Sequence, residues 1–536
     1  MTVVGSESSD SAIYSNRDTQ ASWKYHTATN HTWHSVSTSG HYMDWNNQPR
    51  PFKIYPDLPE QRLPTGFPSS GMSALDSLTG GASGESAELT LENLAGLLYY
   101  SAGVTKGAEG PGGRMFFRAA ACTGALYHIE LYLVCGDLPD LEAGVYQFGA
   151  HDFALRRLRE GDFRGVLAEA SAGEPSVADA PVVIVTTSVY WRNSWKYQDR
   201  AYRHCYWDSG VILANLLAMG NAYRLPLKVV ASFADGPVNR LLDLDEQREV
   251  ALQLVPVGRS SQPPVLPAGE VVPLGLRVEP YSRREVDYPA IREMHAASSL
   301  SSPEEASGLR GSPPPLKDRK GPEPQGTLFP LDLPPTEELP QDTIEEVIIR
   351  RGSSRRFRRE SISYRQLSTM LDRATRGVDA DFLEEPGAAQ SPEDVPTLNQ
   401  LYLIVNDVDG LPAGSYVFHR DRGALEQLQA GEMRETAGRL DLGQELASDA
   451  SVNVYFLTDL NAVLERYGNR GYRMAQMEAS TMGGRLYLGA YAQRLGATGL
   501  TFFDDEVTEF FSPHAEGKSV MFLVAVGRST RRRRTA

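Results

Sequence analysis

Hydrophobic and polar positions along the chain alternate in two characteristic ways. The apolar residues of Leu91–Tyr100 recur at helical spacing, which predicts a helix. Val182–Thr187 is a short β-branched run, typical of a buried strand. A further strand, a core helix and a closing strand are predicted at Tyr127–Val134, Val211–Met219 and Val250–Val257. The first patterned region therefore mixes helices and strands.

Two less regular segments set the expected domain boundaries. Residues 1–85 are polar and end in a proline-punctuated stretch. Residues 261–340 contain Pro-Pro and Ser-Ser steps, a composition that cannot bury a core, although a short helix could form at Pro289–Leu300. We therefore expect a lead-in at 1–85, a domain at 86–260, a linker at 261–340 and a second domain at 341–536.

The two patterned regions repeat each other. The pattern Leu-x-Ala-Gly-x-Tyr-x-Phe at 141–148 recurs at 411–418, an offset of 270 residues. At this offset Tyr197, Arg200, Tyr202 and Arg203 recur as Tyr467, Arg470, Tyr472 and Arg473, and Phe233-x-Asp235 recurs as Phe503-x-Asp505. Val257–Ser260 recurs as Val526–Ser529, one residue out of step. Such an offset indicates one fold present twice, and two such domains usually pack as a pseudo-symmetric dimer.

Composition and charge narrow the class of protein. A formal net charge of −15 argues against a nucleic-acid partner, and the one basic cluster, Arg528 with Arg531–Arg534, is a short tail. The three cysteines form no CxxC pair, which fits a reducing compartment. No apolar run is long enough to cross a membrane, and no secretory signal follows Met1. A cytoplasmic protein without a membrane segment is expected.

A first motif offers donors to a phosphate. Arg351-Gly-Ser353-Ser-Arg355-Arg-Phe places a hydroxyl between two forked guanidiniums. It resembles the Arg-x-Ser-x-Arg-x-Phe signature that opens the nitroreductase fold, whose arginines hold the phosphate of FMN. In the same domain Arg528 is a further candidate for the phosphate. The alternative interpretation is a solvated basic helix end.

A second motif is Arg118-Ala-Ala-Ala-Cys122-Thr-Gly124-Ala-Leu-Tyr127. It resembles the Arg-x-x-Pro-Ser-x-Gly-x-x-Tyr loop beside the flavin in SagB-type enzymes, with Ala121 in place of Pro and Cys122 in place of Ser. The resemblance makes Arg118, Cys122 and Gly124 candidates for cofactor contact. A glycine there would let backbone approach a flat ring.

The third motif, Trp195-Lys196-Tyr197-Gln-Asp-Arg200-Ala-Tyr202-Arg203, resembles the Lys-Tyr and Arg-x-Tyr-Arg pattern of thiazoline oxidases, where the Lys-Tyr pair is the catalytic candidate. Burial and the charges of Arg200 and Arg203 would lower the pKa of Lys196, which would make it a better base. Tyr197 could relay a proton. The alternative is a solvent-facing lysine at a helix start.

Together these motifs identify the chain as similar to the SagB/ThcOx (thiazoline oxidase) type of FMN-dependent dehydrogenases, nitroreductase superfamily, in a tandem two-domain form. The resemblance implies an α+β fold: each domain has a mostly antiparallel sheet wrapped by helices, and FMN lies between the domains. It implies oxidation of azoline rings (thiazoline or oxazoline) to azoles in ribosomally made peptides, with a cyclodehydratase as a candidate partner. A monomer packed as a pseudo-dimer, or a higher homo-oligomer, is expected.

The two domains differ in complementary ways. Domain 1 has Lys196 where domain 2 has Arg466. Opposite Arg351, Ser353 and Arg355, domain 1 aligns Leu78, Gly80 and Ala82, and opposite the loop of 118–127, domain 2 has only the truncated 396–402. These losses predict one composite site, in which domain 2 binds the phosphate and domain 1 supplies the loop and the Lys-Tyr pair.

Other functions remain open at this point. A nitroreductase or enone reductase fed by NAD(P)H is one alternative, and a flavin-less scaffold subunit of a peptide-modifying complex is another. No metal site is expected, because His26 and His31 do not share a helix face and no carboxylate or cysteine completes a set with His34. Asp208 and Glu478, equivalent in the repeat, are expected to satisfy structural hydrogen bonds.

Overall fold

Each half of the chain folds around one sheet, and the two sheets have the same strand order. The computed structural model describes residues 15–80, 86–110, 113–260, 264, 270–311, 323–383 and 395–530. Within these residues the first sheet runs β1-β6-β5-β4-β7-β8, and the second runs β9-β15-β14-β12-β16-β18 with β10 and β17 added on β18. All neighbouring strands in both sheets are antiparallel. The expected α+β class and the tandem arrangement are confirmed.

Each strand of the first sheet has a counterpart in the second, which has β10 and β17 in addition. In the first sheet they are β1 Glu60–Arg62, β4 Ile129–Cys135, β5 Gly144–Gly149, β6 Ala154–Glu160, β7 Val182–Val189 and β8 Glu249–Val257. In the second they are β9 Thr327–Pro330, β10 Phe357–Arg358, β12 Asn399–Val405, β14 Gly414–His419, β15 Ala424–Ala430, β16 Val452–Thr458, β17 Gly496–Gly499 and β18 Ser519–Ser529. Two small ladders complete the set: the hairpin β2 Val104–Gly110 with β3 Gly113–Arg118, and β11 Ile362–Ser363 with β13 Val408–Asp409.

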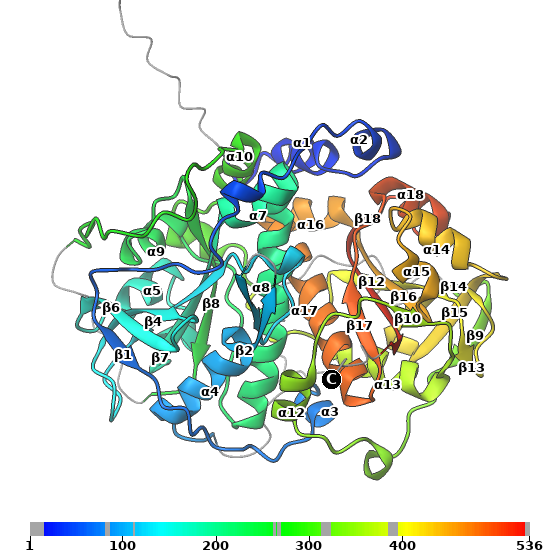
Figure 1. Cartoon of the computed structure of the whole chain (residues 1–536), viewed down its shortest axis with the longest axis horizontal. Helices are drawn as coiled ribbons and strands as arrows, with labels where there is room; N and C mark the ends of the chain where they lie inside the picture. Colours follow the sequence, from blue (N-terminus) through cyan, green and yellow to red (C-terminus); the bar gives the residue numbers. More distant parts are fainter. Residues whose placement is uncertain are drawn as a thin grey trace, which may run out of the picture.

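Two long helices, α8 (Ala201–Ala222) and α17 (Arg470–Ala492), lie side by side between the sheets (Figure 1). They are almost wholly buried, and small residues line their crossing. A Cβ on Gly210 would lie 1.9 Å from Ser480 Oγ, and a Cβ on Gly484 would lie 2.5 Å from that of Ala214. In each contact the two residues are 270 positions apart and therefore equivalent in the repeat, so the two helices cross at equivalent positions.

The remaining helices cover the sheets and the ends of this central pair. In the first half they are α1 Gln20–Ala28, α2 Trp33–Ser37, α3 Ala74–Ser77, α4 Leu91–Ala102, α5 Arg164–Ala170, α6 Pro175–Ala178, α7 Tyr190–Tyr197 and α9 Asp235–Leu241. In the second half they are α10 Pro289–Ala297, α11 Pro303–Ser307, α12 Ile344–Arg350, α13 Tyr364–Ala374, α14 Arg434–Leu440, α15 Glu445–Asp449, α16 Leu460–Tyr467 and α18 Asp504–Phe511. The predicted helix at Leu91–Tyr100 and the predicted core helix correspond to α4 and α8.

The repeat extends beyond the boundaries expected from the sequence. Strand β1, from the lead-in, pairs with β6, and β9, from the expected linker, pairs with β15 in the same way. Helices α10 and α11 of that linker repeat α1 and α2 of the lead-in. Each structural unit therefore includes the segment that precedes its patterned region, and the stretch at 261–340 does more than connect two domains.

A pseudo-twofold axis relates the two halves. Ser73 and Thr343 form an isolated antiparallel bridge, and each is the N-cap of its own helix, α3 or α12. Ala74 N donates to Asp342 O at 2.9 Å, and Ile344 N donates to Met72 O at 3.1 Å. The backbone thus exchanges equivalent hydrogen bonds across the axis, as in an isologous dimer interface.

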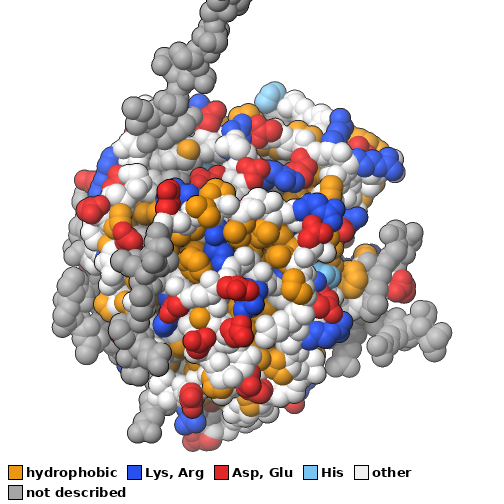
Figure 2. All heavy atoms as spheres, turned by 90° about the vertical axis from the view of Figure 1, so that its left-hand side faces the viewer, with side chains coloured by type: hydrophobic (Ala, Val, Ile, Leu, Met, Phe, Trp, Pro, Cys, Tyr) orange, Lys and Arg blue, Asp and Glu red, His pale blue; other side chains and the backbone are white. Residues whose placement is uncertain are grey.

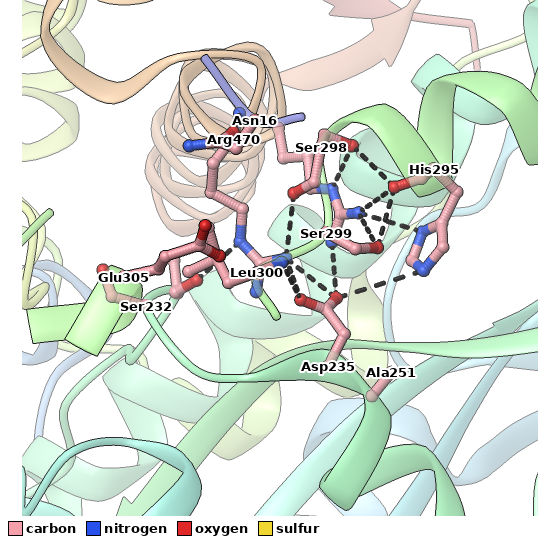
Figure 3. A network of polar contacts seen from close by, with 12 residues as sticks. Asn16, Ser232, Asp235, Ala251, His295, Ser298, Ser299, Leu300, Glu305 and Arg470 are labelled. Carbon is pink, nitrogen blue, oxygen red and sulfur yellow. Dashed lines mark hydrogen bonds and ion pairs between the residues drawn. The ribbon is translucent and has the colours of Figure 1, made fainter. Parts of the chain in front are cut away.

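Buried ion pairs cross the boundary between the halves in both directions. Arg470 and Arg473 of α17 reach Asp235 at the start of α9, at 2.8 and 2.9 Å (Figure 3). Arg200 and Arg203 reach Asp504 at the start of α18, at 3.0 and 2.6 Å. Each aspartate therefore pairs with two arginines of the opposite domain.

The lead-in and the expected linker complete these two networks. Arg203 donates to His26 O and Thr29 Oγ1 of α1 and its C-cap, at 2.7 and 2.9 Å. Arg473 donates to His295 O of α10 at 2.7 Å, and its Nε donates to the neighbouring Ser298 Oγ at 2.8 Å. The pattern His-x-x-Thr of the lead-in thus has a counterpart, His-x-x-Ser, that the sequence comparison missed.

One equivalence drawn from the sequence is wrong by one residue. Asp235 was matched to Asp505, but the residue that pairs with the opposite arginines is Asp504. Asp505 instead accepts from Asn30 Nδ2 at 3.0 Å. The one-residue shift seen at Val257 and Val526 has already occurred before α9 and α18, so the offset there is one less than in the sheets.

The outer surface carries mixed charges. On the face shown in Figure 2, acidic and basic side chains are interspersed, with hydrophobic side chains between them. In the part of the chain that the structure describes, no helix is both long and apolar enough to span a membrane.

Loss of the cross-domain ion pairs should lower the stability of the fold at low pH. Burial alone would raise the pKa of Asp235, but Arg470 and Arg473 lower it to about 2, from an ordinary value of 3.8. A carboxyl whose pKa is depressed on folding stabilises the fold above its unfolded pKa and loses that contribution as pH falls toward its folded pKa. Asp235→Ala should cost about 3–5 kcal/mol near neutral pH, because two buried arginines lose their partner.

Denaturant unfolding from pH 7 to pH 2 measures this difference. The difference in unfolding free energy between wild type and Asp235→Ala should become smaller below about pH 4. Asp57→Ala, which breaks the exposed pair with Arg277, is the control and should unfold like wild type. A difference in unfolding free energy that stays constant down to pH 2 would show that Asp235 is not the group responsible for the loss of stability at low pH.

Candidate active site

The three sequence motifs meet at one place on the domain boundary. Lys196 and Tyr197 end α7, and the loop after β3 leads from Arg118 to Tyr127. The phosphate motif follows α12 of the other domain, where the chain is extended because Arg351 is a non-helical C-cap. Residues of both domains therefore meet here: two motifs come from domain 1 and one comes from domain 2.

Gly124 lies directly against Tyr197. It has a φ of +63°, and a Cβ at this position would lie 2.9 Å from the Tyr197 hydroxyl. Glycine is thus required both for the backbone conformation and for the close approach. The ring that the loop approaches in this structure is the phenol of Tyr197, which also makes a T-shaped contact with His204, with ring centroids 4.5 Å apart.

Arg351 crosses the boundary and holds the same loop by its backbone. Its Nε donates to Ala119 O at 2.9 Å and its Nη2 donates to Arg118 O at 3.1 Å. The side chain is buried, and burial lowers the pKa of Arg351. Among the described residues no carboxylate pairs with it, which is unusual for a buried arginine.

Further cations surround this position without acidic partners. Lys196 is half-buried, and its Nζ lies 5.1 Å from the centroid of the Tyr197 ring. Burial and then the charge of Arg355 lower the pKa of Lys196. Burial and then the charge of Arg351 lower the pKa of Lys106, whose Nζ donates to Arg351 O at 2.6 Å. Within the described ranges, no carboxylate forms an ion pair with Lys106, Lys196 or Arg355.

The arginines expected to act on Lys196 point elsewhere. Arg200 and Arg203 are buried and both pair with Asp504, so their guanidiniums are directed at that carboxylate and not at Lys196. The cation that lowers the pKa of Lys196 is Arg355, which comes from the other domain. The direction expected from the sequence is right, but the named partners are wrong. Burial raises the pKa of Tyr197, so the phenol stays protonated near neutral pH.

Cys122 belongs to a hydrogen-bond network that fixes the loop. Its Sγ donates to Asp208 at 2.9 Å and accepts from Tyr127 N at 3.0 Å. Asp208 also accepts from Thr123 N and Oγ1, and it lies 2.8 Å from His128 Nε2. Burial, and then Asp208, raise the pKa of the Cys122 thiol, so it is a poor nucleophile.

Glu478 plays the matching role in domain 2. It accepts from Leu398 N and from Asn399 N and Nδ2, the residues at the start of β12. Burial raises the pKa of Glu478 to about 7. Asp208 and Glu478 thus both hold the backbone that enters the central strand, and the prediction that they serve structural hydrogen bonds is confirmed.

Three other predicted site residues already form hydrogen bonds within the protein. Arg118 is buried and donates to Ile129 O and Pro51 O at 3.1 and 2.7 Å. Ser353 is half-buried and hydrogen-bonds Tyr487. Arg528 Nε donates to Ser361 O at 2.8 Å, on the far side of the motif from Arg351. The arginines of the tail, 531–534, lie outside the described residues.

The equivalent position in the other half is filled by the chain itself. Arg466, the counterpart of Lys196, donates to the carbonyls of Gly308, Arg310 and Gly311, at 3.2, 3.1 and 2.6 Å. These residues follow α11, in the expected linker. Leu78, opposite Arg351, is buried, Gly80 has no side chain, and Ala82 lies outside the described residues. The second position has neither an available cation nor a phosphate motif.

Comparisons with known proteins agree with this architecture. Residues 348–528 match the family model described as Nitroreductase family. The second domain is a nitroreductase-family domain. A protein of Methanocaldococcus jannaschii named as a nitroreductase is 28% identical over 174 residues, which make up 32% of this chain and 83% of that protein.

The likeness of fold reaches over both nitroreductase-like halves. A crystal structure from Anabaena variabilis, described as a nitroreductase, has a TM-score of 0.74 at 24% identity and covers 95% of this chain and 99% of that one. A chain of the E. coli microcin synthetase complex with a truncated precursor bound covers 45% of this chain and 93% of its own length, at 18% identity and a TM-score of 0.30. The first likeness shows the shared tandem fold, and the second carries no argument at that score.

Sequence reasoning missed Lys106, Tyr487 and His204. Lys106 lies on a hairpin that no pattern predicted, and Tyr487 and His204 lie on helices whose residues are nearly all buried. An excess of lysine or arginine over acid near the loop at 118–127 is the one signal that could have suggested Lys106.

Gly124→Ala should be more harmful than its backbone conformation alone explains. Gly173 has a φ of +67° and nothing within 4 Å of an added Cβ, so Gly173→Ala measures the conformational penalty alone. Gly124→Ala should lose about 1–3 kcal/mol more, because Tyr197 or the loop must move. Thermal unfolding of the two variants makes the comparison, and equal losses would show that the contact with Tyr197 is not restrictive.

Proposed function

We propose that this chain is an FMN-dependent dehydrogenase that oxidises azoline rings to azoles in ribosomally made peptides, at one composite site per chain. The observation that carries the proposal is the joining of the three motifs across the domain boundary: Arg351 donates to Arg118 O and Ala119 O, and Gly124 of the same loop packs on Tyr197. The closed position at Arg466 supports a single site. The nitroreductase-family match supports flavin chemistry.

The cations at the boundary fit the phosphate of FMN. Arg351, Arg355, Lys106 and Lys196 form no ion pair with a carboxylate in the described parts of a chain whose net charge is −15. Arg351 is buried and Lys196 is half-buried, and a buried cation is stable when an anion neutralises it. Lys106 and Arg355 are exposed at the same boundary. Arg355 and Ser353 would hold the phosphate, while Arg351 also fixes the loop of domain 1. This division makes Arg355 the cleaner residue for a test.

The protein residues have separable roles in the reaction. Oxidation of an azoline to an azole removes a proton and a hydride, and bound FMN supplies the acceptor for the hydride. Lys196 Nζ would take the proton, because its lowered pKa leaves more neutral amine available near neutral pH than in a free lysine. Tyr197, protonated and packed on Gly124, would donate a hydrogen bond to the ring being oxidised.

A nitroreductase fed by NAD(P)H is the second candidate, favoured by the names of the similar proteins. The two candidates differ in their reductant. Rapid anaerobic reduction of the flavin by NADPH, with no reduction by an azoline peptide, would support the nitroreductase. Reduction by the peptide alone would support the dehydrogenase.

The cofactor prediction is one FMN per chain, held through Arg355. Arg355→Ala removes one charge-assisted contact worth about 1.5–3 kcal/mol, so FMN should bind roughly 10- to 100-fold more weakly. Arg356→Ala, the neighbouring exposed arginine, is the matched control and should keep wild-type affinity. Flavin released on denaturation gives the stoichiometry, and fluorescence titration gives affinity. Two tightly held flavins per chain would sink the single-site proposal.

The base prediction is that Lys196→Ala keeps FMN but slows flavin reduction by the peptide about 100-fold or more. Lys196→Arg should be nearly as slow, because a guanidinium stays protonated. Arg466→Lys is the matched control and should leave both rate and stoichiometry unchanged, since the chain covers that position. If Lys196→Ala reduces its flavin at the wild-type rate, the base lies elsewhere.

A further inference from the structure

Two clusters of potential metal ligands occur within the described residues, and they differ in one respect. Cys122, His128 and Asp208 form the first. There both ring nitrogens of His128 are engaged, by Ser188 Oγ at 2.8 Å and by Asp208 at 2.8 Å. Asp208 is also engaged by Thr123. This cluster is a closed hydrogen-bond network with no ring nitrogen left for an ion.

The second cluster lies in domain 2 and has an unused nitrogen. His419 ends β14, Glu426 lies on the neighbouring β15, and His514 lies in the turn after α18. One ligand atom from each lies within 4.8 Å of the others. The Nε2 of His514 is buried and has no hydrogen-bond partner, although a buried ring nitrogen normally has one.

The surroundings orient these groups as ligands. His514 Nδ1 lies 2.9 Å from the Tyr402 hydroxyl, which can itself donate to His514 O at 3.3 Å. With that arrangement Nδ1 carries the proton and Nε2 keeps an unused lone pair for an ion. The other carboxylate oxygen of Glu426 accepts from Gln325 N and Gly326 N, both at 2.7 Å. Hydrogen bonds of this kind hold metal ligands in place.

We propose that His419, Glu426 and His514 bind one Zn²⁺ ion. Two imidazoles and a carboxylate are a donor set that zinc prefers, at about 2.0–2.2 Å from each atom. His419 Nε2 and Glu426 Oε2 already lie 2.7 Å apart, sharing the proton that the ion would displace. His514 is half-exposed and on a turn, so a small rotation brings it to the ion. A water molecule would be the fourth ligand of the ion.

The equivalent place in domain 1 lacks the ligands. Gly149 and Arg156 stand where domain 2 has His419 and Glu426, and Arg156 pairs with Asp152 at 2.5 Å. The fold thus forms without an ion there, and the proposed site is an addition to domain 2. The ion would tie β14, β15 and the turn after α18 together, and through Glu426 it would secure the segment that leads into β9.

The test uses the tag-free full-length protein with its flavin, treated with a chelator and titrated with ZnSO₄ against a chromophoric competitor. We expect one Zn²⁺ per chain by elemental analysis and a higher melting temperature with zinc. His514→Ala and Glu426→Gln should weaken binding about 100-fold or more.

His34→Ala removes an exposed histidine far from the cluster in sequence and should bind zinc like wild type. Circular dichroism and flavin content show that each variant is folded, and because His514 lies on a turn its variant should fold normally. Absence of stoichiometric binding at micromolar zinc would overturn the proposal. So would wild-type affinity in folded His514→Ala. Neither outcome depends on the activity at Lys196.

Discussion

Four buried arginines and two buried aspartates hold the two domains together, and each aspartate belongs to the domain opposite its arginines. Because removal of either carboxylate leaves charge stranded in the interior, each half depends on the other to pair its buried arginines. Arg200 ends the short 3₁₀ turn that follows Tyr197 and is the N-cap of α8, and Arg203 lies in the first turn of that helix. Their pairing with Asp504 therefore fixes where α7 ends, and so sets Lys196 opposite Arg355.

Much of the fold follows from the repeated pattern, because periodic hydrophobic positions and a constant offset depend only on local sequence. The N-terminal units of each half escaped notice because α1 and α10 share little besides a histidine and a hydroxyl three residues later. What they have in common is a set of backbone carbonyls and one side chain aimed at an arginine. Contacts made through the backbone do not depend on residue type, so this similarity is visible in the structure but hardly in the sequence.

The candidate site was predictable as a set of residues but not as an electrostatic arrangement. The composite character followed from complementary loss between the halves. The cation that acts on Lys196 did not, since Arg355 is distant in sequence while Arg200 and Arg203 are near. The sequence suggests that the charges of Arg200 and Arg203 act on Lys196, but in the structure both arginines pair with Asp504. Likewise Cys122, aligned beside a flavin, is directed into the carboxylate network of Asp208.

The reciprocal pairs also constrain how the protein is made. His31 N donates to Asp504 Oδ2 at 2.8 Å, so the lead-in is bound by a residue that follows 473 positions later in the chain. At about 5–20 residues per second, Asp504 is made roughly 12–50 seconds after residue 260, the end of the first domain. During that interval Arg200 and Arg203 lack the carboxylate of Asp504, and α8 lacks the helix α17 against which it packs. The nascent first half should therefore be held by chaperones, and a truncated chain should be degraded instead of accumulating as a folded half-molecule.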